Sequence, residues 1–159
     1  PYTTLFRSQG HGGILGGYST KQGVGPFERF AMGGVSLMDY SLLGRELISL
    51  RGYPEEHILP QDKKRGYKGG TIFNKVALEL RHPLVKSPVA YIYALAFAEA
   101  GNTWSNYTDW QPLDLKRSVG FGLRLYLPFP GAIGLDWGYG FDKAGDKLEF
   151  HWSLGGSIR

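Results

Sequence analysis

The segment Lys116–Phe141, KRSVGFGLRLYLPFPGAIGLDWGYGF, decides the fold class of this 159-residue chain. Large apolar residues alternate with small or polar ones on both sides of the turn residues Pro128–Gly131. A period of two residues is typical of a β-strand with one apolar face. The segment therefore predicts an antiparallel hairpin, whose apolar face consists of Val119, Phe121, Leu123, Leu125, Leu127, Ile133, Leu135, Trp137 and Tyr139.

The same alternation recurs on both sides of this hairpin, so we expect an all-β chain. Strands of about ten residues can cross a hydrocarbon core of ~30 Å when they tilt as in a barrel. The stretch Gly12–Ser19 is expected to end a further strand, and residues 1–9, which fit the alternation poorly, to be a non-native or disordered tail. The remaining strands are predicted at about 70–82, 89–104, 116–128, 132–142 and 147–157.

Periodicity alone does not separate a soluble β-sandwich from a membrane β-barrel, because both have strands with one apolar face. Three features favour the barrel. The strands are long, their second face combines glycine with charge, and Trp137, Tyr139, Phe150 and Trp152 suit the aromatic girdles of a membrane barrel. We therefore expect about six C-terminal strands of an antiparallel transmembrane β-barrel in the outer membrane of a Gram-negative bacterium, in contact with outer-membrane lipid.

The composition argues against several other classes of protein. The longest apolar run, Val89–Ala98, ends at Glu99 and is too short for a membrane helix. The chain has no cysteine, so it has no thiolate metal site or disulfide. The basic run Lys63–Arg65 fits a solvated loop better than a nucleic-acid site. No nucleophile–histidine–acid set has a convincing spacing around His11, His57, His82 and His151, so we expect no enzyme activity and no cofactor or metal.

A long connection separates the first strand from the others. Residues 23–69 show little strand alternation, and 45 or so residues are far more than a hairpin loop needs. The segment is too rich in large apolar residues to be disordered, and it therefore needs a surface to pack against. We expect a long extracellular loop that folds inward into the mouth of the barrel.

Three motifs lie in this loop and in the strands after it. Pro26–Phe30 is followed by the pair Gly33–Gly34, Ser49–Tyr53 reads SLRGY, and Phe97–Gly101 reads FAEAG. In this order and spacing the chain resembles the BamA family of outer-membrane protein assembly factors over about residues 10–157. That family has an aspartate where this chain has Glu99.

The resemblance implies a loop-to-barrel lock in which Arg51 enters the lumen and pairs with Glu99. The lock residues it implies are Arg51, Gly52, Tyr53, Glu99, Phe97, Gly101 and Asp136, and Glu79 is a further lumen-facing candidate. Two alternatives stay open. Arg51 would be an exposed turn residue before Pro54, or the bulky face of 89–100 would point to lipid and take Glu99 with it.

The resemblance also implies a function. BamA proteins fold and insert other outer-membrane proteins, so the implied partners are unfolded outer-membrane protein clients and accessory periplasmic lipoproteins. It further implies that upstream strands and periplasmic domains precede this chain, and that Gly155 and Gly156 lie at a lateral seam, although glycines there could equally relieve crowding. A TamA-like factor, a two-partner secretion transporter and a passive porin or structural barrel remain as alternatives.

Overall fold

The computed structural model describes residues 3–17, 23–35, 45–128 and 131–154. Six strands form one sheet in the order β1-β4-β5-β6-β7-β8, and each pair of neighbours is antiparallel. These strands are β1 (Leu5–Ile14), β4 (Ile72–Lys86), β5 (Tyr91–Trp104), β6 (Lys116–Tyr126), β7 (Ala132–Gly140) and β8 (Leu148–Leu154). The prediction of an all-β fold is confirmed. β1 and β8 are the edge strands, so the sheet is open within this chain.

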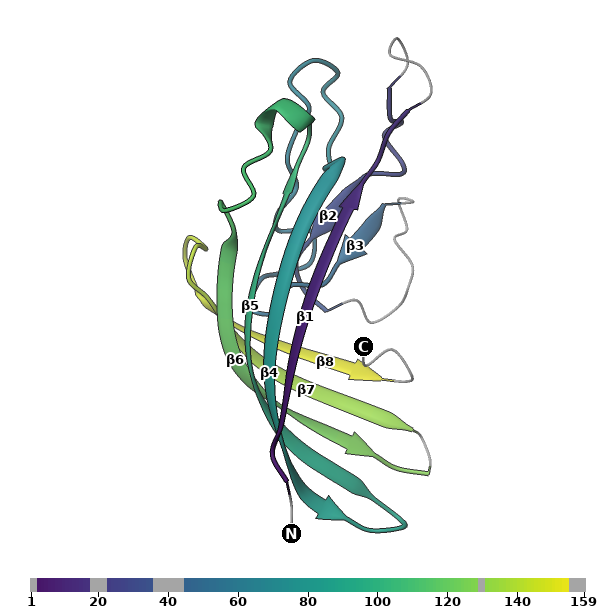
Figure 1. Ribbon diagram of the computed structural model, residues 1–159, viewed down its shortest axis with the longest axis vertical. Helices are drawn as coiled ribbons and strands as arrows, with labels where there is room; N and C mark the ends of the chain where they lie inside the picture. The colour runs from purple at the N-terminus through teal and green to yellow at the C-terminus, as the bar shows by residue number, and fades with distance from the viewer. Residues whose placement is uncertain (1–2, 18–22, 36–44, 129–130, 155–159) are drawn as a thin grey trace.

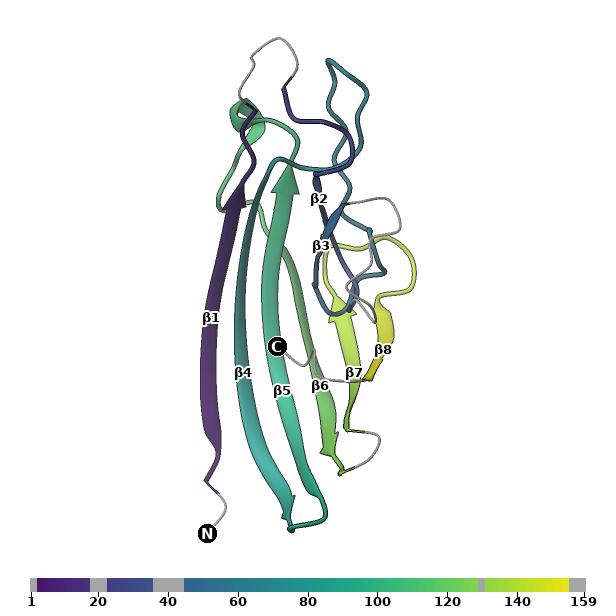
Figure 2. The ribbon, with the colours of Figure 1, turned by 90° about the vertical axis from the view of Figure 1, so that its right-hand side faces the viewer.

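The sheet is strongly curved (Figures 1 and 2). Its two faces differ in the chemistry of their side chains. Successive side chains of a strand point to opposite faces. The concave face carries buried charged residues, which include Lys75, Glu79, Glu99, Arg124 and Asp136. The convex face carries exposed large apolar residues, which include Val76, Leu78, Leu80, Phe121, Phe150, Trp152 and Leu154. An apolar outer wall around a charged interior is the arrangement expected of a membrane barrel.

The described part of the segment between β1 and β4 lies on the concave side of the sheet (Figure 2). It contains two short parallel strands, β2 (Phe30–Met32) and β3 (Glu46–Ile48). Its apolar side chains form a core of their own with β4, in which Phe30 packs edge-on against Phe73 at a ring distance of 4.7 Å. The buried members of this core are Phe30, Met32, Leu50, Tyr53 and Phe73. The apolar side chains of this connection are thus buried against one another and against β4.

Two strands differ from the prediction. β1 begins at Leu5, within the segment 1–9 that is predicted to be a tail. The middle convex positions are held by Ser8, Gly10 and Gly12, and large apolar residues stand on this face only near its ends, at Phe6 and Ile14. The apolar period is therefore broken, and the strand is defined instead by its ladder to β4. β4 continues to Lys86, beyond the predicted end at residue 82, because a bulge accommodates Pro83.

One short 3₁₀-helix, η1 (Tyr107–Asp109), lies in the connection from β5 to β6. Among the described residues no helix is long and apolar enough to span a membrane. The predicted seam residues Gly155 and Gly156 lie outside the described residues.

Candidate functional site

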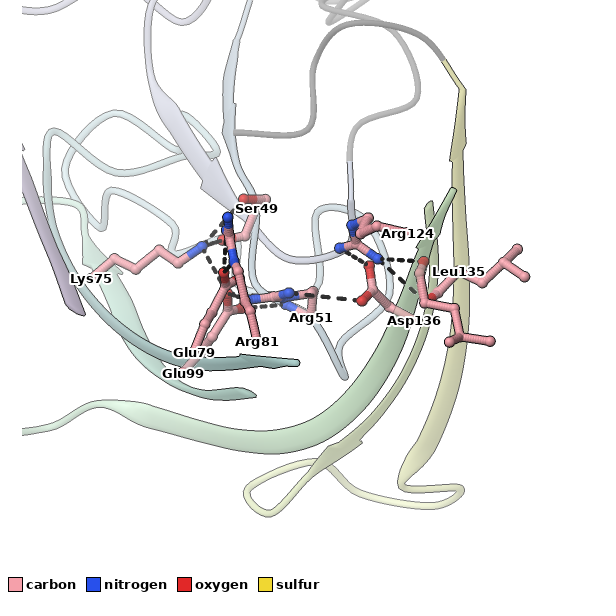
Figure 3. A network of polar contacts seen from close by, with 10 residues as sticks. Ser49, Arg51, Lys75, Glu79, Arg81, Glu99, Arg124, Leu135 and Asp136 are labelled. Atoms are coloured by element: carbon pink, nitrogen blue, oxygen red, sulfur yellow. Dashed lines mark hydrogen bonds and ion pairs between the residues drawn. The ribbon is translucent and has the colours of Figure 1, made fainter. Parts of the chain in front are cut away.

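Arg51 reaches from the loop into a cluster of carboxylates on the concave face (Figure 3). Its backbone N–H donates to Glu99 Oε2 at 2.9 Å, and its Nε and Nη2 donate to Glu99 Oε1 at 3.0 and 2.6 Å. Nη2 also donates to Glu79 Oε1 at 2.7 Å. Arg51 is 6% exposed and Glu99 is 5% exposed, so both charges are removed from water and each depends on the other.

Phe97, on the concave face of β5, also contacts the Arg51 guanidinium. The Arg51 guanidinium carbon lies 3.9 Å from the centre of the Phe97 ring, which is a close cation–π contact. Phe97 and Glu99 share a face because they are two residues apart. The bulky face of β5 therefore points to the loop. The convex face at the same level carries the small residues Ala96 and Ala98.

Three further cations complete the cluster. Lys75 on β4 donates to the backbone carbonyl of Ser49 and lies 3.5 Å from Glu99 Oε1. Arg124 on β6 donates to Asp136 Oδ2 on β7 at 2.8 Å, and Asp136 Oδ1 lies 3.7 Å from Arg51 Nη1. Arg81 on β4 pairs with Glu79. The cluster thus places the three carboxylates of Glu79, Glu99 and Asp136 against four cations.

Gly52 lies directly on the strands, and only glycines allow this approach. A Cβ atom at Gly138 would lie 2.5 Å from the Gly52 nitrogen, closer than real Cβ contacts come. Gly52 itself has a φ of +89°, in the left-handed region that favours glycine. Its N–H donates to Nε2 of His151 on β8 at 3.2 Å, so this ring nitrogen must be unprotonated for the hydrogen bond to form.

Tyr53 joins the turn formed by residues 51–53 to the ends of two more strands. Its hydroxyl donates to the carbonyl of Arg117 on β6 at 2.8 Å and accepts from the N–H of Asp142, just after β7, at 3.3 Å. Burial raises the pKa of the Tyr53 hydroxyl above its ordinary value, which keeps it protonated as a donor. Residues 51–53 therefore contact all five strands from β4 to β8.

Comparison with known proteins identifies the family. The family model of the Omp85 superfamily domain matches residues 2–158. The chain belongs to the Omp85 superfamily. A comparison with curated proteins gives no match. Members of the Omp85 superfamily are outer-membrane proteins, which supports a bacterial outer-membrane location and agrees with a curved sheet that fits part of a β-barrel. The Omp85 match includes most of the segment 1–9.

The structure of this Omp85 domain brings the predicted lock residues to one place. Glu99, Phe97 and Asp136 each contact Arg51, and Gly52 and Tyr53 extend the contacts to β6 and β8. Gly101 has a different neighbour, because a Cβ atom there would lie 2.8 Å from the sulfur of Met32 in β2. It allows the loop core, and not the arginine, to approach β5.

Sequence reasoning missed Lys75, Arg124, Gly138 and His151. Each of them lies on the non-apolar face of a predicted strand, but alternation gives only the face. It does not say which residues on that face lie under the turn. The register of the ladders supplies this: Glu99 lies opposite Ser118 on β6, and Gly138 lies opposite Gly120.

A second buried ion pair closes the base of the loop. Arg29 Nη2 donates to Asp62 Oδ2 at 3.3 Å and to the Val24 carbonyl at 3.3 Å, and Nη1 donates to the Gly69 carbonyl at 3.2 Å. Burial alone would raise the pKa of the Asp62 carboxyl. Hydrogen bonds from the backbone of Lys64 and Arg65 and from Arg29 outweigh it, so the pKa lies below its ordinary value. This pair joins the two ends of the loop.

Proposed function

We propose that this chain is the C-terminal part of the barrel of an outer-membrane protein assembly factor of the BamA type. Such a protein inserts and folds other outer-membrane proteins, without catalysing a covalent reaction. Its substrates would be unfolded outer-membrane protein clients, and accessory periplasmic lipoproteins would assist it. The observation that carries the proposal is the buried contact of Arg51 with Glu99.

The geometry of this contact supports a mechanical role for the loop. A buried arginine paired with carboxylates from β4, β5 and β7 resists separation of these strands, because separation would leave charges without partners in a low-dielectric interior. The loop thereby holds β4–β7 as one rigid wall. β8 is attached to the turn only by the Gly52–His151 hydrogen bond among the described residues. A wall held firmly up to β7 and weakly at β8 suits a protein that opens next to its last strand.

Other functions of an outer-membrane barrel remain as alternatives. A TamA-like factor or a two-partner secretion transporter would hold its loop in the same way, and the latter would move a polypeptide through the lumen. A passive porin would need an open and charged pore. The loop core of Phe30, Met32 and Leu50 fills part of the concave face, which favours a plugged barrel over a passive pore.

A reconstitution experiment separates these functions. The full-length protein is placed in lipid vesicles with the appropriate accessory lipoproteins, and a urea-unfolded eight-stranded client barrel is added from the periplasmic side. The client's resistance to SDS and to protease is followed in time. An assembly factor accelerates the appearance of SDS-resistant client in the membrane, relative to vesicles that contain an unrelated barrel. Protease-protected client inside the vesicle without SDS resistance would indicate secretion, and equal folding rates would refute assembly.

The arginine provides the matched variants for this assay. Arg51→Ala removes the buried guanidinium, and Arg117→Ala removes an exposed one, whose side chain is 67% exposed in its pair with Asp142. Tyr53 hydrogen-bonds to the backbone carbonyl of Arg117 and to the backbone N–H of Asp142, and the control substitution keeps both groups. We expect Arg51→Ala to lower the client folding rate and Arg117→Ala to leave it unchanged. Equal rates for both variants would remove the role of the loop.

A further inference from the structure

The connection from β5 to β6, residues 105–115, folds over the convex face of the sheet. Asn102 and Asn74 lie on this face, because they alternate with the concave residues Gly101 and Lys75. The Asn102 side-chain amide donates to the Asp114 carbonyl at 2.7 Å. With the Asn74 amide oriented so that its oxygen faces the indole, Trp110 Nε1 donates to Asn74 Oδ1 at 3.2 Å. Two anchors thus hold the connection against the outside of the wall.

Burial along the convex face agrees with this placement. Near the connection, Ile72 is 3% exposed, Asn102 is 6% exposed and Trp104 is 7% exposed, although all three lie on the outer face. Further along the same face of β4, Val76, Leu78 and Leu80 are about half exposed, at 49%, 47% and 50%. The outer wall is therefore covered only at its extracellular end, where residues 105–115 lie.

The covering segment presents large apolar side chains outward. Tyr107 is 70% exposed, Trp110 is 36% exposed and Leu113 is 92% exposed. The rings of Tyr107 and Trp110 lie 5.9 Å apart, so they form one aromatic patch. Leaving these groups in water gives up the free energy of their burial, and a patch of this kind marks a contact surface.

We propose that residues 105–115 form a membrane-interface anchor, in which Tyr107, Trp110 and Leu113 rest in the outer leaflet at the boundary between headgroups and acyl chains. The patch is continuous with the lipid-facing wall, since Asn74 is the polar residue next to the apolar run Val76, Leu78 and Leu80 on the convex face of β4. Tyrosine and tryptophan have an apolar ring and a polar group, and they concentrate at this depth of a bilayer. Here residues 105–115, which lie against the convex face, supply aromatic side chains at the membrane interface, whereas strand residues supply them in other parts of a barrel.

This chain has no cysteine, and any cysteine elsewhere in the full-length protein is replaced by serine before a thiol is introduced. Leu113→Cys is made in the full-length protein, labelled with a nitroxide and reconstituted into vesicles of outer-membrane lipid without any other protein. The label's collisions with oxygen, which partitions into lipid, and with a nickel chelate, which stays in water, are measured by power saturation. Lys63→Cys in the exposed basic run and Leu78→Cys on the convex wall provide the aqueous and lipid references.

We expect the label at residue 113 to be shielded from the nickel chelate several-fold relative to residue 63, with an oxygen accessibility between the two references. A label at 113 that meets the chelate as freely as the label at 63 would overturn the proposal. Adding Asn102→Ala to Leu113→Cys removes one anchor and should raise the accessibility to the chelate. Unchanged accessibility would refute the role of Asn102 in holding the patch on the membrane. Client folding is not measured, so this result is independent of the assembly function.

Discussion

Two long connections of this chain fold in opposite directions over the same sheet. The described parts of residues 23–69 turn to the concave face, where Arg51 forms its buried pair with Glu99 (Figure 3). Residues 105–115 turn to the convex face and are held by the neutral amides of Asn74 and Asn102. The inward connection inserts a charge, whereas the outward one exposes aromatic rings.

The difference shows that the chemistry of the anchoring side chains decides the direction of each loop. A buried guanidinium needs carboxylates as partners, and buried carboxylates occur on the concave face. A lipid-facing wall accepts no isolated charge at low cost. Amide side chains next to that wall can satisfy a loop's backbone and indole N–H groups without adding charge. Variants that exchange or remove these anchors test the comparison.

Arg51→Ala should have the largest effect on stability. It leaves Glu99 buried with Lys75 as its remaining cationic partner, so we expect a loss of about 3–5 kcal/mol of unfolding free energy. Urea titration of the reconstituted barrel, read as the shift between folded and unfolded bands on SDS gels, measures it. Arg117→Ala removes an exposed guanidinium, so it is the matched control and should leave the unfolding free energy nearly unchanged. A loss of similar size in both variants would show that the Arg51 contacts add nothing.

Gly138→Ala should have the next largest effect, because the added methyl group would collide with the backbone of Gly52. Overpacking of this kind costs about 1–3 kcal/mol. Gly10→Ala on β1 provides the control, since no atom lies within 4 Å of the added Cβ there. Limited proteolysis of residues 45–62, together with the urea titration, reports whether the turn has been lifted off the wall. A variant as resistant as Gly10→Ala would argue against close contact at Gly138.

Asp62→Asn should loosen the base of the inward loop by a smaller amount, about 1 kcal/mol. The pKa of Asp62 is lower in the folded than in the unfolded protein, so the charge stabilises the fold fully above about pH 4. This contribution disappears as the pH falls through the folded pKa. Stability measured from pH 7 down to pH 3 should therefore show wild type and variant converging in acid. A difference that is constant with pH would contradict the role of the Asp62 charge.

Trp110→Phe should have the smallest effect, because it removes one hydrogen bond to Asn74 and keeps an aromatic ring on the surface. A loss of about 0.5–1.5 kcal/mol is expected. The spin label at residue 113 should respond more clearly than the overall stability does. Tyr107→Phe is the control, since no hydrogen bond of its hydroxyl group holds the loop to the wall in the described contacts. Identical label accessibility in both variants would show that the hydrogen bond from Trp110 to Asn74 does not hold residues 105–115 in place.

Alternation predicted most of the sheet because its strands repeat every two residues. In the segment Lys116–Phe141 the predicted strands 116–128 and 132–142 agree with β6 and β7 to within two residues at each end. β1 was not predicted because serine and glycine occupy the middle of its convex face and interrupt the apolar alternation. β5 was ambiguous for the opposite reason. Its bulky face, with Phe97 and Glu99, points inward because Arg51 of the loop supplies a cation for both side chains, which lipid cannot do for Glu99.

The candidate site was accessible to sequence reasoning only through its motifs. Spacing within SLRGY and FAEAG singles out Arg51 and Glu99 as partners once a resemblance to a family is drawn. The close approach of Gly52 to Gly138 and its hydrogen bond to His151 could not be predicted, because they depend on which residues of β7 and β8 lie next to residues 51–53. Strand register fixes this, and alternation by itself leaves it open.

A double-mutant cycle on Arg51 and Glu99 tests the central claim most directly. Unfolding free energies are measured for the wild type, Arg51→Ala, Glu99→Ala and the double variant under one set of conditions. Because each single variant leaves a buried charge with fewer partners, the double variant should be no less stable than the worse single one, and the coupling energy should reach about 2–3 kcal/mol. Losses that simply add, within about 0.5 kcal/mol, would contradict a loop held to the wall by this pair.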